Sequence, residues 1–227
     1  MNRIIPLLLI LIAQFSYGQL VTLSKSERIS DGTDKLLYKI DPKMDSAEYI
    51  GEVEVDGFSA RDTEIFAQVY KKAKTIGANG FSLKEMESID GTLQSFNPNH
   101  YYLNLYEVKE MPKRDNTVYI LYSHLKPGKL KINDKQQQIE PRSYLKLTLK
   151  PGEIVSIAMG GFLGSKIVLG YKENQPVQYY QLLPAGVRAS NHASEGGLNL
   201  KSGDIIAVER SYAEFLTTIY SGAEYSN

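Results

Sequence analysis

Three histidines are the residues best suited to acid–base chemistry or metal binding at neutral pH: His100, His124 and His192. Metal sites built from one short segment place their ligands a few residues apart, and none of these histidines lies three or four residues from another. The chain contains no cysteine, which excludes thiolate catalysis and thiol–disulfide chemistry. We therefore expect histidines that are solvated or satisfied by hydrogen bonds, and the sequence predicts no catalytic, cofactor-binding or metal-binding residues.

Two glycine-rich segments could present backbone amides to an anion. Residues 160–165 (GGFLGS) lack the lysine of a phosphate-binding loop and the G-x-S-x-G order of a nucleophile elbow. They predict a turn or bulge between strands. Residues 77–80 (GANG) follow a predicted helix, so they present carbonyls instead of the amide-rich helix start that attracts anions. We interpret both segments as structural.

Tyrosine is abundant, with 16 in the chain and no tryptophan. Two pairs stand out, Tyr101-Tyr102 and Tyr179-Tyr180. Sheet surfaces lined by tyrosine can bind glycans or partner strands, but tyrosine is also an ordinary strand residue with a half-buried ring. The ordinary role is the favoured interpretation.

Two acid pairs occupy alternate strand positions and therefore share a face, Glu52 with Glu54 and Glu85 with Glu87. Such a pair could serve as the two carboxylates of a glycosidase-like site or form a solvated edge. Nothing in the sequence separates the two, and a solvated edge is the default expectation.

The first half of the chain predicts an α+β layer with one helix on a sheet. Apolar residues at spacings of three and four predict a helix over residues 62–76, capped by Ser59 or Asp62 and ended by Gly77. Residues 19–33 carry little periodicity and are expected to be irregular. Short apolar runs predict an edge strand at 36–40 and further strands at 47–55, 81–86 and 101–108.

The second half predicts an all-β sandwich, immunoglobulin-like or related, with a short C-terminal helix. Residues 186–197 are expected to form a loop. Ser211 and Glu214 resemble a capping box that opens the helix, and Gly222 is expected to end it. The asparagine and aspartate at 133–134 predict a hairpin turn. Alternating runs predict strands at 117–123, 129–133, 143–149, 154–159, 166–171, 177–183 and 204–209.

The chain begins with the three parts of a secretory signal peptide: Arg3, an apolar run over residues 4–13, and small residues at Ser16 and Gly18. The apolar run is about half the roughly 20 residues that span a bilayer, so we expect cleavage after residue 18 and no stable membrane anchor afterwards. The predicted organisation is a signal peptide at 1–18, an α+β domain at 19–111 and a β-sandwich domain at 112–227. The 26 basic and 26 acidic residues balance, which argues against nucleic acid as a partner.

Tyr49 to Val53, the predicted helix, and Lys72 to Asn79 together resemble the "A…GAN" signature of small bacterial envelope domains, and the match covers roughly residues 47–108. The group includes stress-sensor lipoproteins of the Rcs type and a family once labelled heavy-metal-binding. The resemblance implies an α+β fold in the bacterial envelope. The Rcs-type proteins depend on cysteines, which this chain lacks, and no ligand residues support metal binding.

Residues 116–184 resemble an uncharacterised β-sandwich domain of bacterial exported lipoproteins, through an opening Thr117-Val118-Tyr119-Ile120, a hairpin from Ser143-Tyr144 to Pro151-Gly152, and a late tyrosine pair. That resemblance implies a sandwich with no assigned activity. The end of the signal peptide resembles those of gliding-type Gram-negative bacteria, which implies the periplasm as the destination.

Three hypotheses follow. The leading one is a non-enzymatic envelope protein, a binding or interaction module with an envelope protein partner and no cofactor. The second is a small-ligand or carbohydrate binder that uses a tyrosine-rich sheet surface, and the third is a hydrolase whose site assembles only in the fold. The oligomeric state is not predicted.

Overall fold

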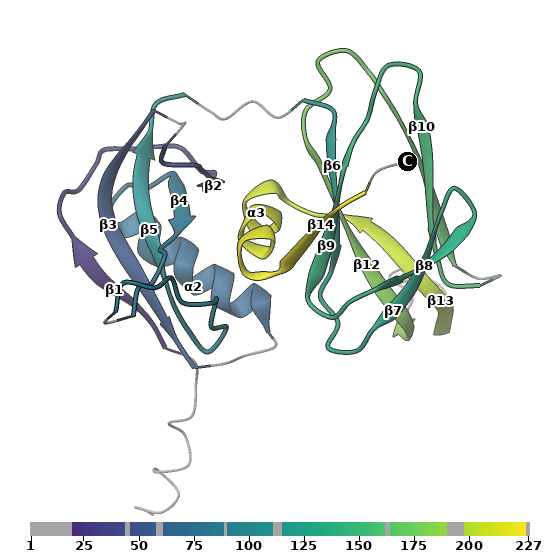
Figure 1. Ribbon diagram of the computed structural model, residues 1–227, viewed down its shortest axis with the longest axis horizontal. Helices are drawn as coiled ribbons and strands as arrows, with labels where there is room; N and C mark the ends of the chain where they lie inside the picture. Colours follow the sequence, from purple (N-terminus) through teal and green to yellow (C-terminus); the bar gives the residue numbers. More distant parts are fainter. Residues whose placement is uncertain are drawn as a thin grey trace, which may run out of the picture. The chain divides into compact units, whose positions relative to one another are not determined.

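The computed structural model describes residues 20–43, 46–57, 61–88, 90–110, 115–161, 164–189 and 198–225 (Figure 1). The chain divides into two compact units, residues 1–109 and 110–227. Within the described ranges, no helix is both long and apolar enough to cross a membrane. The signal peptide predicted for residues 1–18 lies outside the described residues.

The first unit is a five-stranded sheet in the order β1-β3-β5-β4-β2, with helix α2 against one face (Figure 1). Neighbouring strands are antiparallel except β2, which runs parallel to β4. The fully buried Val53 and Val55 alternate with Glu52 and Glu54, so one face of β3 is apolar and the other is polar. The elements are β1 (Leu20–Ser26), β2 (Tyr38–Lys39), β3 (Ala47–Asp56), α2 (Asp62–Thr75), β4 (Gly80–Leu83) and β5 (His100–Val108).

The expectation of an irregular segment at 19–33 is wrong for its first part, because residues 20–26 form edge strand β1. Val21 pairs with Val55 and Leu23 pairs with Val53, and the register then shifts at a bulge before Lys25. Val21 and Leu23 alternate with polar residues, but the bulge ends this pattern after two apolar residues, so the signal for a strand is short. The predicted strand at 36–40 is present as the two-residue edge strand β2.

Helix α2 covers nearly the predicted range, but its start differs from the expectation. Arg61 is the N-cap residue, without a side-chain cap, and Asp62 is the first helical residue and is buried. Ser59 lies outside the described residues. At the other end Gly77 has φ +76°, and a Cβ there would lie 2.0 Å from the Ser30 carbonyl oxygen. Glycine is therefore required for both backbone conformation and space.

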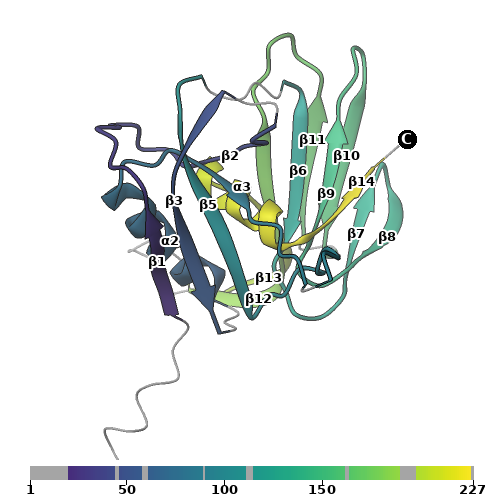
Figure 2. The same cartoon turned by 60° about the vertical axis from the view of Figure 1, so that its left-hand side comes forward.

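The second unit consists of two sheets that enclose one apolar core (Figure 2). One sheet has the order β11-β10-β7-β8, and the other has the order β13-β12-β6-β9-β14. Buried residues from both sheets form a single cluster, including Ile120, Ile132 and Ile157. The strands are β6 (Thr117–Tyr122), β7 (Gly128–Ile132), β8 (Lys135–Ile139), β9 (Ser143–Thr148), β10 (Ile154–Met159), β11 (Ser165–Gly170), β12 (Gln178–Ala189), β13 (Leu198–Ala207) and β14 (Ser221–Glu224).

The second sheet of this unit is mixed, because β12 runs parallel to β6 and β14 runs parallel to β9. Helix α3 (Arg210–Ile219) contacts β12 and β6. The predicted hairpin turn at Asn133 and Asp134 is confirmed: both have positive φ, 49° and 61°, as the favoured two-residue turn between β7 and β8 requires.

Three expectations for the C-terminal part are wrong. Strand β12 continues to Ala189, so the predicted loop at 186–197 begins inside a strand, although residues 190–197 lie outside the described residues. The capping residue of α3 is Glu209, whose carboxylate accepts hydrogen bonds from the backbone amides of Ser211 and Tyr212. Gly222 does not end the helix but lies within β14, a strand whose polar, unalternating sequence gave no signal.

Candidate binding surface on the first sheet

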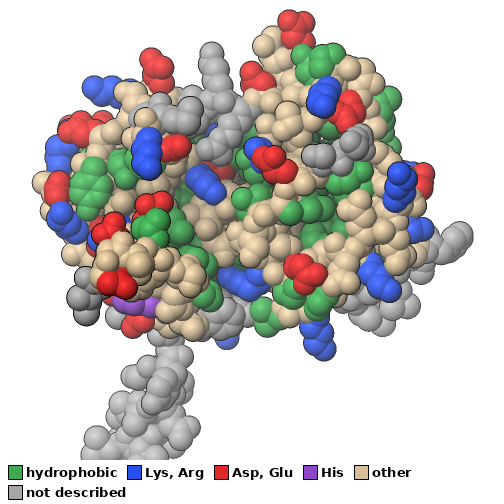
Figure 3. Space-filling model, in the orientation of Figure 1, with side chains coloured by type: hydrophobic (Ala, Val, Ile, Leu, Met, Phe, Trp, Pro, Cys, Tyr) green, Lys and Arg blue, Asp and Glu red, His purple; other side chains and the backbone are tan. Residues whose placement is uncertain are grey.

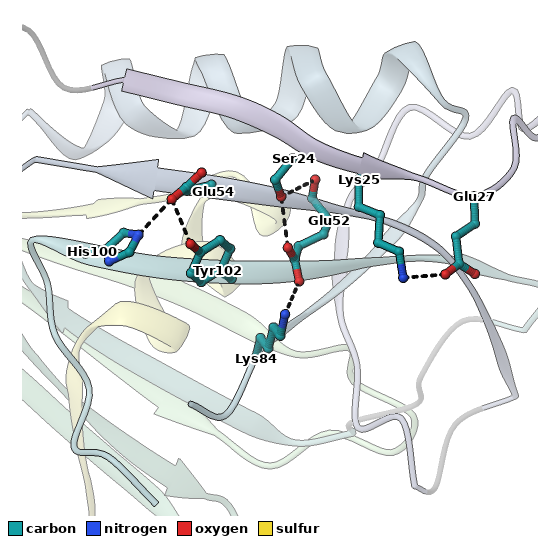
Figure 4. A network of polar contacts seen from close by, with 8 residues as sticks. All are labelled: Ser24, Lys25, Glu27, Glu52, Glu54, Lys84, His100 and Tyr102. Carbon is teal, nitrogen blue, oxygen red and sulfur yellow. Dashed lines mark hydrogen bonds and ion pairs between the residues drawn. The ribbon is translucent and has the colours of Figure 1, made fainter. Parts of the chain in front are cut away.

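The face of the first sheet opposite α2 carries a row of interacting polar side chains, which we call the open face (Figure 4). It comprises Ser24, Glu52, Glu54, Lys84, His100 and Tyr102. Lys25, Tyr49 and Asn104 lie beside them on the same face. The residues come from β1, β3, the end of β4 and β5, strands that the sheet order places side by side. Alternation along β3 and β5 brings these side chains to one face, because the intervening residues are the apolar core.

Glu52 is the buried acid of the open face. Its carboxylate accepts a hydrogen bond from the Ser24 hydroxyl at 2.9 Å and lies 2.5 Å from the Lys84 ammonium. The Glu52 side chain is 9 % exposed, whereas the Lys84 side chain is 46 % exposed. The expectation that Glu52 is solvated is therefore wrong, because cross-strand neighbours replace water around its carboxylate.

Glu54 holds two aromatic side chains. One of its oxygens lies 2.8 Å from His100 Nε2 and accepts a hydrogen bond from the Tyr102 hydroxyl at 2.7 Å. These two hydrogen bonds, with His100 first, lower the pKa of Glu54, and donation to Glu54 raises the pKa of Tyr102. A carboxylate with a lowered pKa is a weak base that stays ionised at neutral pH. Glu54 is therefore better suited to hold His100 and Tyr102 in place than to transfer protons.

Lysine side chains lie over the tyrosine rings of the open face. The Lys84 ammonium is 5.2 Å from the centre of the Tyr102 ring, and the Lys25 ammonium is 5.4 Å from that of Tyr49. Lys25 also pairs with Glu27, and that hydrogen bond raises the pKa of Lys25. The open face therefore combines ring surfaces, ammonium groups and carboxylates within one layer.

The histidines are not gathered together. His100 lies in the first unit, and His124 lies exposed in the second, where its Nδ1 accepts a hydrogen bond from the Lys126 amide at 3.1 Å. His192 lies outside the described residues. Throughout the described part of the chain, no three histidine or acidic side chains are placed to hold a metal ion. His100 and His124 are satisfied as expected.

The second acid pair does not form a strand face. The strand predicted at 81–86 ends at Leu83, and both Glu85 and Glu87 are exposed in the segment that follows. The chain turns back at Asp90 and Gly91. The alternating pattern of the sequence therefore continues for a few residues beyond Leu83, where the strand itself ends.

The paired tyrosines divide between faces. Tyr101 is buried on the α2 side, whereas Tyr102 is half buried on the open face. Tyr179 is buried and stacks on Tyr119 with 5.2 Å between ring centres, and Tyr180 packs against the core of the second unit. Tyr102 and Tyr180 are ordinary half-buried strand residues as expected, whereas Tyr101 and Tyr179 are buried more deeply.

Both glycine-rich segments have structural roles. Residues 160–165 connect the antiparallel strands β10 and β11, and the Ser165 hydroxyl donates to Asp204 at 2.5 Å, not to a histidine. In the GANG segment, the Asn79 side chain donates to the Val108 carbonyl at 2.9 Å and accepts from the Val108 amide at 2.7 Å. The side-chain amide of Asn79 thus forms with β5 the pair of hydrogen bonds that the backbone of a neighbouring strand would form.

Sequence reasoning missed Ser24 and Lys84 as members of the open face. Ser24 belongs to a segment expected to be irregular, and Lys84 follows the last residue of β4. The alternation of Val21 and Leu23 with polar residues was the available signal for β1. Pairing with β3, which only the fold provides, explains why Ser24 meets Glu52.

Comparisons with protein-family models, with curated proteins and with solved structures found no match to this chain. The geometry of the open face therefore has to support a function by itself.

Proposed function

We propose that the protein is a non-enzymatic binding or protein-interaction module of the bacterial envelope, and that the open face is its contact surface. One observation carries the proposal: Glu52 and Glu54 fix Lys84, His100 and Tyr102 on one face of the sheet. The three fixed side chains remain partly exposed. Side chains ordered in advance lose less entropy on binding, which favours recognition.

The charge distribution supports a protein partner over nucleic acid. Basic and acidic side chains are interspersed on the face of the molecule in Figure 3, and the formal net charge is zero. A nucleic-acid surface needs a continuous basic stripe that displaces counterions. An envelope protein with mixed surface charge fits this surface better.

Export to the periplasm is part of the proposal, and it depends on the signal-peptide pattern of residues 1–18 and on the resemblance to exported domains. The periplasmic fraction of the native host should contain a protein whose first residue is Gln19. Recovery of the chain with Met1 in the cytoplasm would refute export. We further propose that the second unit is a variant of the immunoglobulin-like sandwich, in which two parallel strand pairs supplement the antiparallel ones.

Photo-crosslinking tests the contact surface. Asn104 lies on the open face of β5 beside Glu52, and Asn104→p-benzoylphenylalanine places a reactive group there. We expect a discrete crosslinked adduct in cells, and we expect it to disappear when Tyr102→Ala is added. The control is the same residue at Lys71, which is exposed on α2 of the same unit. Equal adducts from both positions, or none from Asn104, would contradict the proposal.

A second candidate is a carbohydrate binder, favoured by the half-buried rings of Tyr49 and Tyr102 on the open face beside hydrogen-bonding side chains. Glycan-array binding that is lost in Tyr102→Ala, without a protein adduct, would favour this candidate. Binding to neither class of partner would leave both without support.

A further inference from the structure

Strand β11 lies at one edge of the four-stranded sheet of the second unit, with β10 as its neighbour. Within the described ranges, no strand pairs with its other edge. An edge strand presents backbone amides and carbonyls that can pair with another chain. This edge shares no residue with the open face, so what it binds is independent of the function proposed for the first unit.

The pairing of β10 identifies which backbone groups of β11 are directed outward. Val168 lies opposite Ser156. The Ser156 carbonyl accepts a hydrogen bond from the Asn133 amide at 2.9 Å, and the Ser156 amide donates to the Asn133 side chain at 2.9 Å. Both backbone groups of Ser156 are therefore turned away from β11, and β10 leaves the backbone of Val168 unpaired. Because alternate residues of an antiparallel pair behave alike, the same holds for Lys166 and Gly170.

Exposed aliphatic side chains lie beside these outward groups. Val168 is 66 % exposed and Ile154 is 68 % exposed. Their sequence neighbours Leu169 and Val155 belong to the core, so Val168 and Ile154 share the outer face of the sheet. Ile154 lies opposite Gly170, where an added Cβ would be 4.0 Å from its Cγ1 atom. The missing side chain at Gly170 leaves room for a group from another chain to cover Ile154.

Four other sheet edges carry features that oppose pairing. Strand β1 has a bulge before Lys25, and β2 is two residues long. Strand β8 carries Lys135 followed by three glutamines, and β14 has only four residues, which include Glu224. Strand β11 has six residues, and Lys166 is the only charged one among them. Of these five edges, β11 is therefore the best suited to accept another strand.

We propose that two copies of the chain associate by antiparallel pairing of β11 with β11, about a twofold axis at Val168. In this register the two Val168 residues lie opposite each other, and Lys166 of each copy lies opposite Gly170 of the other. All three outward residues then take part in backbone hydrogen bonds. Moving the axis by one residue, to Ile167, would leave two such pairs and would place Lys166 opposite Val168.

The side chains of β11 are complementary to themselves in this register. The two Val168 side chains meet on the outer face, and Ile167 lies opposite Leu169 on the inner face. The apolar stem of Lys166 crosses the space above Gly170 and covers Ile154 of the other copy. No two charged side chains of β11 lie directly opposite each other. This complementarity favours a second copy of the chain over an unrelated extended segment.

Light scattering of the chain from residue 19 to residue 227 tests the association. We expect the mass to rise from one chain to two with increasing concentration, with a dissociation constant on the order of 10 µM, because pairing of two edge strands forms a small interface. Val168→Lys places two ammonium groups opposite each other and should raise this constant about tenfold or more. Ile29→Lys is the matched control, since it replaces a 71 % exposed aliphatic residue of the first unit, and it should not change the constant.

Disulfide trapping tests the register. Since the chain has no cysteine, Val168→Cys introduces a single thiol, and the two Cα atoms at the axis would be about 5.5 Å apart, within the range of a disulfide. We expect oxidation to convert most of this variant to a disulfide-linked dimer. Ile154→Cys has a similarly exposed position on the same face. Its two copies are separated by three strand spacings, at least about 14 Å, so it should remain monomeric under the same oxidation.

Three results would overturn the proposal. The first is the mass of a single chain at about 200 µM, well above the expected dissociation constant. The second is a dimer that persists unchanged in Val168→Lys, which would place the contact elsewhere. The third is equal disulfide formation in Val168→Cys and Ile154→Cys, which would indicate random collision.

Discussion

The ammonium of Lys74 connects the end of α2 to the segment before β2, and its replacement provides a direct test of how the first unit is held together. Its Nζ donates to the carbonyls of Asp34, Leu36 and Ala78 at 2.8, 2.7 and 2.8 Å. Only a protonated amine has three hydrogens for three such bonds. Burial lowers the pKa of Lys74, and the nearby Asp34 carboxylate opposes this effect.

The expected cost of Lys74→Met follows from these bonds. A hydrogen bond from a charged group contributes about 1.5 to 3 kcal/mol when it is well shielded. Because Lys74 is only partly buried, water can reach some of the released carbonyls, and about 1 kcal/mol for each bond is the better value. We therefore expect the free energy of unfolding of the first unit to fall by about 3 kcal/mol. Methionine retains an apolar stem, so lost packing should add little.

Hydrogen exchange read by mass spectrometry in increasing urea provides the assay, because peptides from β3 and β5 report on the first unit alone. Local protection should fall most at residues 34–38, because the carbonyls of Asp34 and Leu36 lose the ammonium. Lys71→Met, at an exposed position of the same helix, should change the free energy by less than about 0.5 kcal/mol. If the two variants were equally stable, the inference that Lys74 clamps this segment would be refuted.

Three other predictions concern single residues. Gly77→Ala should lower the free energy of unfolding by more than about 3 kcal/mol, and Gly152→Ala should lower it by about 1 kcal/mol. Both glycines have positive φ, but only at Gly77 would the added Cβ meet a backbone atom. Urea denaturation of the two variants measures the difference. By the same measurement, Asn79→Ala should lower the free energy of unfolding by about 2 kcal/mol, because two hydrogen bonds to Val108 are lost. Asn79→Asp should be no more stable, because a charged oxygen replaces the group that donates to the Val108 carbonyl. Carbon NMR should give Asp90 a pKa of about 2, and Ser88→Ala should raise it, because the Ser88 hydroxyl is the main cause of the lowering. Since that folded-state pKa is lowered, the contribution of Asp90 to stability should be complete above the ordinary value of 3.8 and be lost as the pH falls through about 2.

Local sequence signals were sufficient for much of the secondary structure. The apolar spacing of α2, the glycine after it and the turn at Asn133 and Asp134 each depend on a few neighbouring residues, so they can be recognised without the fold. The absence of cysteine is likewise a property of the sequence alone. The helix, the glycine and the turn concern backbone conformation, which adjacent side chains largely decide.

The tertiary structure decided which side chains meet. Glu52 and Glu54 are both glutamates on the same face of β3. Yet Glu52 is buried against Ser24 and Lys84, whereas Glu54 holds two aromatic side chains. The difference arises from pairing with β1 and β5, strands that lie 28 and 48 residues away along the chain. Strand β14 was invisible for the same reason, because its place beside β9 depends on the return of the chain through α3. Contacts between distant residues depend on the whole fold, and no local pattern encodes them.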